Sequence, residues 1–207
     1  MNQPELIVQL QQGDESAFTK LVDEWQDMVY NTALGIVQNA DDADDITQEV
    51  FIQVFQSVSS FKGESKFSTW LYRITVGKAL DHEKKRKRKK RFAFVQSLFG
   101  GTGEEPLHPV EFNHPGVQLE KKEKATALFN ALKQIPDKQR IAFTLHKLEG
   151  QSYQEIAEIM NTSLYAVESL MGRAKVNLKK VLNPGTGCPR PWPRKRPPAT
   201  NRTARSR

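Results

Sequence analysis

The chain has 207 residues, with 31 Lys and Arg against 24 Asp and Glu, and a single cysteine. This length suits one large or two small domains, the lone Cys188 excludes an internal disulfide, and no Cys/His cluster has zinc-site spacing. No apolar run approaches the roughly 18 residues that span a bilayer, and residues 1–5 do not resemble a secretory signal. We therefore expect a cytoplasmic protein without a metal or other cofactor.

The net charge of +7 is divided into blocks of one sign. Residues 1–60 hold eleven acids and one base, and residues 61–91 hold twelve bases and three acids. Residues 92–120 carry four acids and no base. Adjacent blocks of opposite sign indicate separate partners, nucleic acid for the basic block and a basic protein surface for the acidic block. The alternative for the acidic block is a solvated set of helix faces.

Apolar residues at helical spacing predict three helices in the first half of the chain. The first spans Phe18 to Ile36, and Asn39 can cap the second. The third begins near Ser68 and runs into the basic run 84–91. No segment alternates with period two, so we expect an all-α fold with a helical domain over residues 1–91. The inward stripe of the second helix is Ala43, Ile46, Val50 and Val54.

Gly and Pro accumulate in residues 92–118, which is typical of a flexible linker. Helical periodicity resumes over residues 119–182, the second expected domain. Residues 183–207 are rich in Pro and Arg and have no apolar period, so we expect a basic disordered tail. The prediction is thus two small helical domains joined by a linker.

A helix-turn-helix is predicted between Tyr153 and Arg173. Ser152 and Glu155 have the spacing of a capping box, and Asn161 stands at the turn, where a left-handed backbone is often required. Small Ala157 permits a close helix crossing. The inward residues of the second helix are Val167, Leu170 and Ala174. The outward set is Ser163, Leu164, Tyr165, Glu168, Ser169 and Gly172, with Arg173 and Lys175 available for phosphates. The alternative is an ordinary helical hairpin in a bundle core.

Three aromatic residues, Phe67, Trp70 and Tyr72, stand beside cations at the start of the third helix. Aromatic faces can stack on unpaired bases, and Lys and Arg neutralise phosphates. This combination favours opening or single-stranded DNA. The alternative is that these aromatic side chains belong to the helical core.

The second helix carries an acidic face opposite its inward stripe, with Asp41, Asp45, Gln48 and Ile52. Apolar residues within an exposed acidic face favour docking to a protein over simple solvation. The four histidines are scattered, and no phosphate-binding loop or metal-ligand spacing accompanies the acids. An enzyme is therefore not expected.

Three motifs stand in an order that resembles the extracytoplasmic-function (ECF) branch of the bacterial sigma-70 family, the dissociable specificity subunits of RNA polymerase. They are Asp44-Asp45-Ile46-Thr47-Gln48-Glu49-Val50-Phe51, Phe67-Ser68-Thr69-Trp70-Leu71-Tyr72-Arg73-Ile74 and Ser152-Tyr153-Gln154-Glu155-Ile156-Ala157. The resemblance covers about residues 5–91 (sigma region 2) and 119–182 (sigma region 4).

The resemblance implies that the acidic helix docks on the β′ clamp helices of core RNA polymerase through Asp45, Gln48, Glu49, Phe51 and Phe55. It implies that the loop and helix beginning at Phe61 recognise and melt the minus-ten promoter element. The residues expected there are Lys62, Lys66, Phe67, Ser68, Trp70, Tyr72, Arg73 and Lys78. The helix-turn-helix would contact the β flap and would read the minus-thirty-five element. The residues expected to bind this DNA are Ser163, Leu164, Tyr165, Glu168, Ser169, Arg173 and Lys175. An anti-sigma protein is a further possible partner.

The chain departs from the family pattern at Gly77, where an Asn is usual, and at Glu168 and Leu170, where many members have Lys and Arg. Glu168 can accept a hydrogen bond from cytosine, so we expect altered promoter preference. Two rival functions remain open. One is a stand-alone helix-turn-helix regulator of duplex DNA, and the other is a protein-binding antagonist or adaptor.

Overall fold

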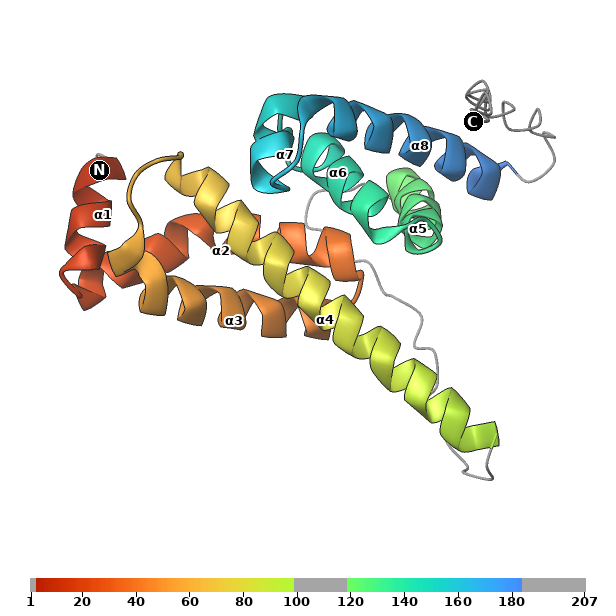
Figure 1. The fold of residues 1–207 in the computed structure, drawn as a ribbon, viewed down its shortest axis with the longest axis horizontal. Coiled ribbons are helices and arrows are strands. Elements are labelled where there is room, and N and C mark those ends of the chain that lie inside the picture. The colour runs from red at the N-terminus through yellow and green to blue at the C-terminus, as the bar shows by residue number, and fades with distance from the viewer. Residues whose placement is uncertain (1–2, 99–118, 184–207) are drawn as a thin grey trace, which may run out of the picture.

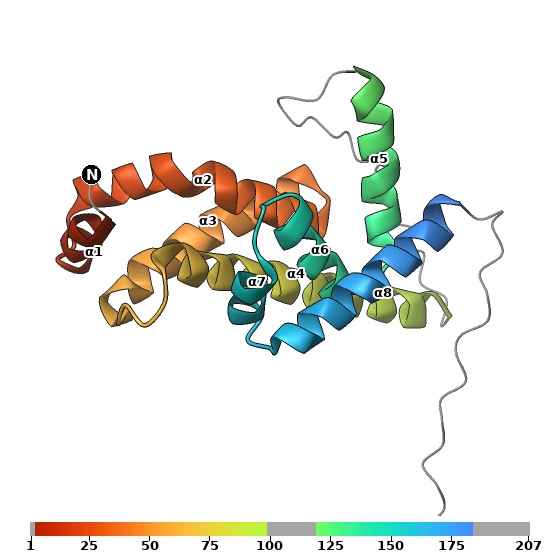
Figure 2. The same cartoon turned by 90° about the horizontal axis from the view of Figure 1, so that it is seen from above.

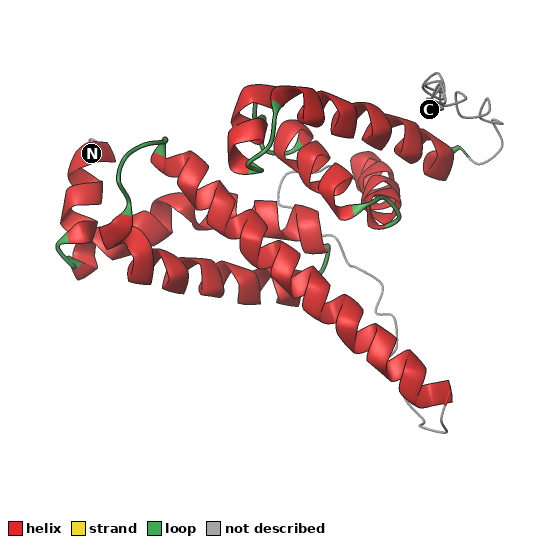
Figure 3. Ribbon diagram, viewed as in Figure 1, coloured by secondary structure: helices red, strands yellow, loops and turns green. Residues whose placement is uncertain are grey.

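The computed structural model describes residues 3–98 and 119–183, and every regular element in these two ranges is helical (Figure 3). This confirms the all-α prediction. Within them, no helix combines the length and the apolar character that a bilayer-spanning segment needs. The elements are α1 (Gln3–Gln11), α2 (Glu15–Val37), α3 (Ala40–Ser57), the short 3₁₀ helix η1 (Val58–Ser60), α4 (Phe67–Leu98), α5 (Leu119–Lys133), α6 (Asp137–Lys147), α7 (Tyr153–Ile159) and α8 (Leu164–Leu182).

Helices α2, α3 and α4 form the N-terminal bundle, and α1 packs across one end of it (Figure 1). The inward stripe predicted for α3 is fully buried. Helix α1, which inserts Leu6 and Leu10 into the core, was not predicted from the sequence. Gln11 joins α1 to the loop before α4, because its Nε2 donates to the carbonyl oxygen of Phe61 at 3.0 Å. Helix α1 therefore helps to position this loop.

Polar side chains fix the beginnings of α2 and α3. Asp14 accepts hydrogen bonds from the side chain of Ser16 and from the backbone N–H groups of Ala17 and Ser16, and these bonds lower the pKa of its carboxyl. Asn39 accepts from the backbone N–H of Asp42 at 2.9 Å, as the sequence predicts. Each side chain supplies an acceptor that the first turn of a helix lacks. The two caps thus fix the residues at which α2 and α3 begin.

Helix α4 continues to Leu98, seven residues into the segment that the sequence analysis placed in the linker. No Gly or Pro occurs between Gly77 and Gly100, and the intervening residues include many Lys and Arg, which are good helix formers. The predicted end of the first domain at residue 91 was placed where the basic run ends. The helix-forming residues continue beyond that point. The rest of the predicted linker and the tail beyond residue 183 lie outside the described residues.

The C-terminal domain contains α5 to α8, in which α8 packs on α5, α6 and α7. Leu132 of α5 and Leu178 of α8 form a small cluster at one end of this domain. At the other end, α6 packs against α2, and α7 packs against α4 (Figures 1 and 2). The two helical domains therefore share one continuous buried core in this arrangement.

Candidate functional site

The exposed side of α3 carries acidic, amide and apolar side chains together. Asp45, Gln48 and Glu49 are exposed, and they lie opposite the buried stripe. Ile52 and Phe55 on the same helix are each 58% exposed. We call these five residues the docking face. A surface with charged residues around large exposed apolar side chains has the composition of a protein-binding site.

Phe51 does not belong to this surface, contrary to the sequence-based expectation. Its side chain is only 7% exposed, and its ring lies edge-on to that of Phe18, with centroids 6.5 Å apart. Residue 51 precedes buried Val54 by three positions, which places both on neighbouring parts of one helix face. Phe51 therefore supports the docking face from beneath, whereas Ile52, which helical spacing places on the acidic face, is exposed as predicted.

The aromatic residues at the start of α4 form a cluster with the preceding loop. The Phe61 ring centroid is 5.5 Å from that of Phe67 and 5.2 Å from that of Trp70. Phe67 is buried, Trp70 is half-buried, and Lys62 and Lys66 are exposed. The core alternative is thus correct for Phe67. Ser68 is half-buried beside it.

An open hollow of about 390 Å³ lies between α1 and this loop. Its walls include Ile7, Gln11, Phe61 and Phe67, with Lys62 at the edge. The hollow thus has both an aromatic ring, that of Phe61, and a cation, Lys62, in its lining. Proteins that bind single-stranded nucleic acid use aromatic rings to stack on bases and cations to bind phosphates. The residues that α1 contributes to the hollow were not predicted, because α1 itself was not predicted from the sequence.

Tyr72 and Arg73 lie against the C-terminal domain in this structure. Tyr72 is 5% exposed, and its hydroxyl donates to Glu149 Oε2 at 3.2 Å. Burial raises the pKa of Tyr72, and the nearby Glu149 carboxylate raises it further. Arg73 Nε donates to the carbonyl oxygen of Glu158 at 3.0 Å. Both side chains were expected to face DNA, and neither partner could be identified from the local sequence.

Lys78 and Glu49 connect the two predicted surfaces of the N-terminal domain. Lys78 Nζ lies 3.4 Å from Glu49 Oε2. Both side chains are partly exposed, so the pair adds little stability. The contact holds a cation of the predicted minus-ten set beside the docking face.

The helix-turn-helix has the local geometry that the sequence predicts. Ser152 and Glu155 form a reciprocal capping box at the start of α7. Bonds from the Ser152 backbone and hydroxyl lower the pKa of the Glu155 carboxyl. Asn161 has φ 47°, the left-handed turn conformation, and Ser163 caps α8 by accepting from Ala166 N at 3.2 Å. The caps and the turn of this motif therefore depend on residues that are close together in the sequence.

One inward position of α8 was misassigned. Val167 and Ala174 are buried as predicted, but Leu170 is only partly buried and Met171 takes the fully buried position. The spacing from Val167 to Met171 is four residues instead of three, which is equally compatible with one helix face. The correction leaves the outward face unchanged.

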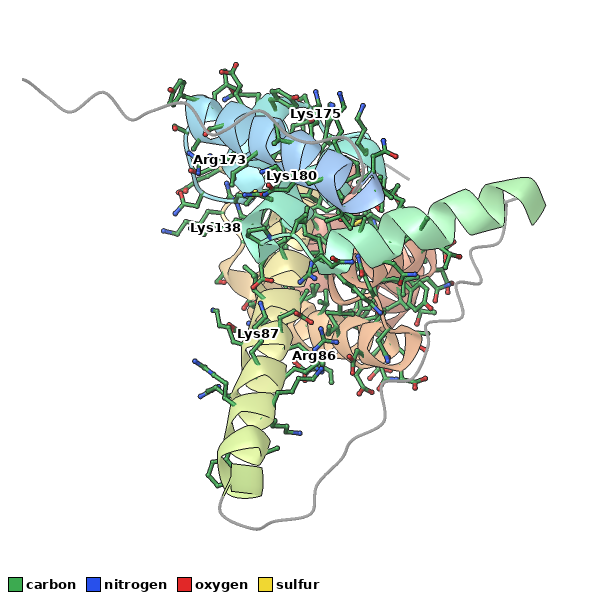
Figure 4. All side chains as sticks on the ribbon, turned by 90° about the vertical axis from the view of Figure 1, so that its right-hand side faces the viewer. Arg86, Lys87, Lys138, Arg173, Lys175 and Lys180 are labelled. Carbon is green, nitrogen blue, oxygen red and sulfur yellow. The ribbon has the colours of Figure 1, made fainter. Side chains whose placement is uncertain are left out.

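The outward face of α8 is exposed near its N-terminus. Tyr165 is 80% and Leu164 is 44% exposed; Glu168, Arg173 and Lys175 are also exposed, and Ser169 is partly buried. Figure 4 shows the basic side chains of Lys138 on α6 and of Arg173, Lys175 and Lys180 on α8, with Arg86 and Lys87 on α4. The start of α8 thus offers groups for base edges, and its later turns offer cations for phosphates.

Metal ligation has no support in the part of the chain that the structure describes, where no three His, Cys, Asp or Glu side chains are grouped suitably. His82 lies 3.4 Å from Asp42, and His146 Nδ1 lies 2.9 Å from the carbonyl oxygen of Gln151. His82 therefore contacts a carboxylate, and His146 contacts a backbone carbonyl oxygen.

Comparison with protein families matches Sigma-70 region 2 at residues 21–89 and Sigma-70, region 4 at residues 125–178. The chain is 31% identical to the RNA polymerase sigma-H factor of Pseudomonas aeruginosa over 182 residues, covering 87% of this chain and 93% of that protein. This chain belongs to the sigma-70 family, in its ECF branch. We therefore refer to the N-terminal domain as region 2 and to the C-terminal domain as region 4.

Further relatives agree with this assignment, and solved structures share the fold. The ECF RNA polymerase sigma-E factor of Haemophilus influenzae is 32% identical over 179 residues, covering 86% of this chain and 94% of that factor. The sigma-E factor of Escherichia coli is 31% identical with 93% of its length covered. The fold is similar to CnrH in complex with the cytosolic domain of CnrY, with TM-score 0.61, 22% identity and coverage of 87% and 97%. It is also similar to the sigma factor RpoE in complex with the anti-sigma factor NepR from Bartonella quintana, with TM-score 0.55, 22% identity and coverage of 80% and 96%.

Proposed function

We propose that this ECF sigma factor is a transcription initiation factor that binds core RNA polymerase and directs it to promoters. The observation that carries the proposal is the presence of region 2 and region 4 in one chain, with an exposed acidic and apolar docking face on region 2. A stand-alone duplex regulator would need the helix-turn-helix of region 4 but no such face.

The docking face of α3 is proposed to bind the β′ clamp helices. Asp45, Gln48 and Glu49 would pair with basic and polar groups of the polymerase, and Ile52 and Phe55 would bury their exposed apolar surface. Phe51 would act indirectly, because it packs beneath this face.

Two surfaces are proposed to bind promoter DNA. In region 2, the hollow beside Phe61 would accept an unpaired base of the minus-ten element, with Lys62 and Lys66 available for phosphates. In region 4, Tyr165 and Glu168 would face bases of the minus-thirty-five element, while Arg173 and Lys175 would bind phosphates. The domain boundaries proposed for these roles are residues 1–91 and 119–182, with α4 extending the first domain to Leu98.

Co-elution with core RNA polymerase tests the docking face. Binding by the wild-type protein and its loss in Asp45→Arg/Gln48→Ala are the expected results. The matched control is Asp23→Arg/Gln26→Ala, which makes the same two changes at the same spacing at exposed positions of α2. Failure of the wild-type protein to bind, where a housekeeping sigma factor binds, would contradict the proposed function. Equal loss in both double variants would contradict the assignment to α3.

A further inference from the structure

A second hollow, of about 610 Å³, lies where α4 passes the end of α5 and the start of α6. Its lining comes from these three helices and from the turn that joins α5 to α6. We call it the basic hollow. None of its residues belongs to the docking face or to the two proposed DNA-binding sets. The proposed function therefore leaves the basic hollow without a role.

Cationic side chains dominate the lining of the basic hollow. The five cations are Arg86, Lys87, Lys90, Lys133 and Arg140. Two carboxylates share the lining, so that its net charge is +3. Figure 4 shows Arg86 and Lys87 on α4, one wall of this hollow. A hollow in which charges of one sign converge attracts a ligand of the opposite sign.

The two carboxylates, Glu83 and Asp137, are engaged by three of the five cations. Glu83 lies 2.7 Å from Arg86 and 3.2 Å from Arg140. Asp137 lies 2.6 Å from Lys87 and 3.1 Å from Arg140.

The other two cations, Lys90 and Lys133, have no such partner. Within residues 3–98 and 119–183, neither of them forms an ion pair with a carboxylate. The ion pairs of the lining therefore leave these two positive charges uncompensated.

Lys133 lies in a region of positive potential. Burial lowers the pKa of its ammonium, and the nearby Arg86 and Arg140 lower it further. Glu83 acts in the opposite direction but does not cancel this effect. An anion bound in the basic hollow would compensate the charges that crowd this ammonium.

Arg140 contributes an unused hydrogen-bond donor to the same lining. Its side chain is only 3% exposed, and its Nη2 donates to Glu83 and Asp137. Its Nε is buried and has no hydrogen-bond partner in the part of the chain that the structure describes. Buried donors are normally paired, because an unpaired donor loses its bonds to water without replacement. An acceptor oxygen in the basic hollow would provide the missing partner.

We propose that the basic hollow binds a small polyphosphate anion, which is either an inorganic chain or the phosphate chain of a nucleotide. Phosphoryl oxygens accept short, charge-assisted bonds from Lys and Arg. A single phosphate carries at most about two charges, whereas a chain of phosphoryl groups can compensate the full +3 of the lining. The volume is within the range of small-molecule sites. This site is separate from the proposed function, which does not depend on it.

A nucleic acid strand is the alternative source of phosphates. Cations that bind such a strand follow its backbone along a groove. In the basic hollow they converge from three helices, and one of them, Arg140, is almost fully buried. A strand that passes over the surface would not reach the Arg140 Nε. The arrangement therefore favours a small ligand.

Titration calorimetry of the full chain with inorganic tripolyphosphate at physiological salt tests the site. Lys90→Gln/Lys133→Gln removes the two cations without a carboxylate partner and is expected to weaken binding about 10-fold or more. The matched control is Lys89→Gln/Lys179→Gln, which removes two charges at exposed positions of α4 and α8 outside the lining. The control should bind like the wild type. Equal losses in the two double variants would overturn the proposal, because binding would then follow net charge alone.

Three further ligands in the same titration identify the source of the phosphates. ATP that binds more tightly than tripolyphosphate would identify a nucleotide, and ATP that binds equally or more weakly would identify an inorganic chain. Either result supports the site, and inorganic phosphate should bind more weakly than both. If only a single-stranded oligonucleotide is weakened by Lys90→Gln/Lys133→Gln, the cations bind nucleic acid and the proposal is wrong.

Lysine acetylation by acetic anhydride, followed by mass spectrometry, locates the ligand on the wild-type protein. Tripolyphosphate is expected to slow the acetylation of Lys90 and Lys133, while Lys89 and Lys179 react as before. This measurement needs no variant, so it decides the question even if the double variant does not fold. Equal protection of all four lysines, or protection of none, would contradict a ligand in the basic hollow.

Discussion

Arg140 of α6 and Glu83 of α4 form an ion pair across the two regions, with Nη2 3.2 Å from Oε2. The two side chains are only 3% and 2% exposed. Each has a second partner in its own region: Arg86 lies 2.7 Å from Glu83 Oε1, and Asp137 lies 3.1 Å from Arg140. The buried charges therefore remain partly compensated when one member of the central pair is removed.

This geometry predicts coupling between Glu83 and Arg140 in a double-mutant cycle. Glu83→Gln and Arg140→Gln should each lower the free energy of unfolding by about 1–3 kcal/mol, since a buried charge loses one partner but keeps another. The double variant should lose less than the sum of the two. Urea unfolding followed by circular dichroism provides the measurement, and strictly additive effects would contradict the pair.

Ser152→Ala removes the hydroxyl half of the capping box at α7 and keeps the bond from the backbone N–H of residue 152 to Glu155 Oε2. The backbone of Glu155 loses an acceptor at 3.2 Å and the Glu155 carboxylate loses the hydroxyl at 2.9 Å. We expect a loss of about 1 kcal/mol in the free energy of unfolding. Gln154→Ala, at an exposed position of the same turn, is the control. Equal thermal midpoints for the two variants would argue against a stabilising cap.

The caps and the turn of the helix-turn-helix could be predicted because their chemistry is local. Asn39 and Ser152 act on backbone groups three residues away, and Asn161 accommodates its own positive φ. The exposed side of α3 followed from helical periodicity alone. These signals require no knowledge of the distant chain.

The errors concern side chains whose surroundings come from elsewhere in the chain. Phe51 is buried by Phe18, 33 positions earlier, and Tyr72 is covered by Glu149, 77 positions later. Helix α1 has only Leu6 and Leu10 in the core, too few for a periodic signal. Helical periodicity predicts which residues share one face of a helix. It does not predict which faces of different helices pack against each other.

Gln38→Gly is expected to stabilise the protein. Gln38 ends α2 with φ 56°, and its buried amide nitrogen and oxygen have no hydrogen-bond partners. Glycine adopts the left-handed conformation without steric cost, and its lack of a side chain removes both unpaired atoms. These gains exceed the lost burial of two methylenes, giving roughly 1 kcal/mol in the free energy of unfolding.

The comparison for this substitution is Asn161→Gly. Asn161 also has positive φ, at 47°, but it is exposed, and asparagine tolerates this conformation. We expect a change of a few tenths of a kcal/mol at most there. A decrease in urea midpoint for Gln38→Gly would show that the buried amide contributes to stability.

Glu149 gives the contact between the regions a defined dependence on pH. Burial raises the pKa of its carboxyl, while hydrogen bonds from Tyr72 and Thr32 act in the opposite direction. The contact between the regions therefore favours protonated Glu149. Its contribution to stability is fully present below the ordinary carboxyl pKa of 4.5 and is lost as pH rises through the raised value.

Glu149→Gln replaces the carboxylate by a neutral side chain of the same shape, so it should be more stable than the wild type at neutral pH. This advantage should shrink as pH falls toward 4.5, because wild-type Glu149 then becomes neutral as well. Free energies of unfolding for both proteins between neutral pH and 4.5 test this. Glu158→Gln, at an exposed position on α7, controls for a general loss of negative charge. An advantage for Glu149→Gln that grows toward acid pH would reverse the sign and show that Glu149 is stabilised in its charged form.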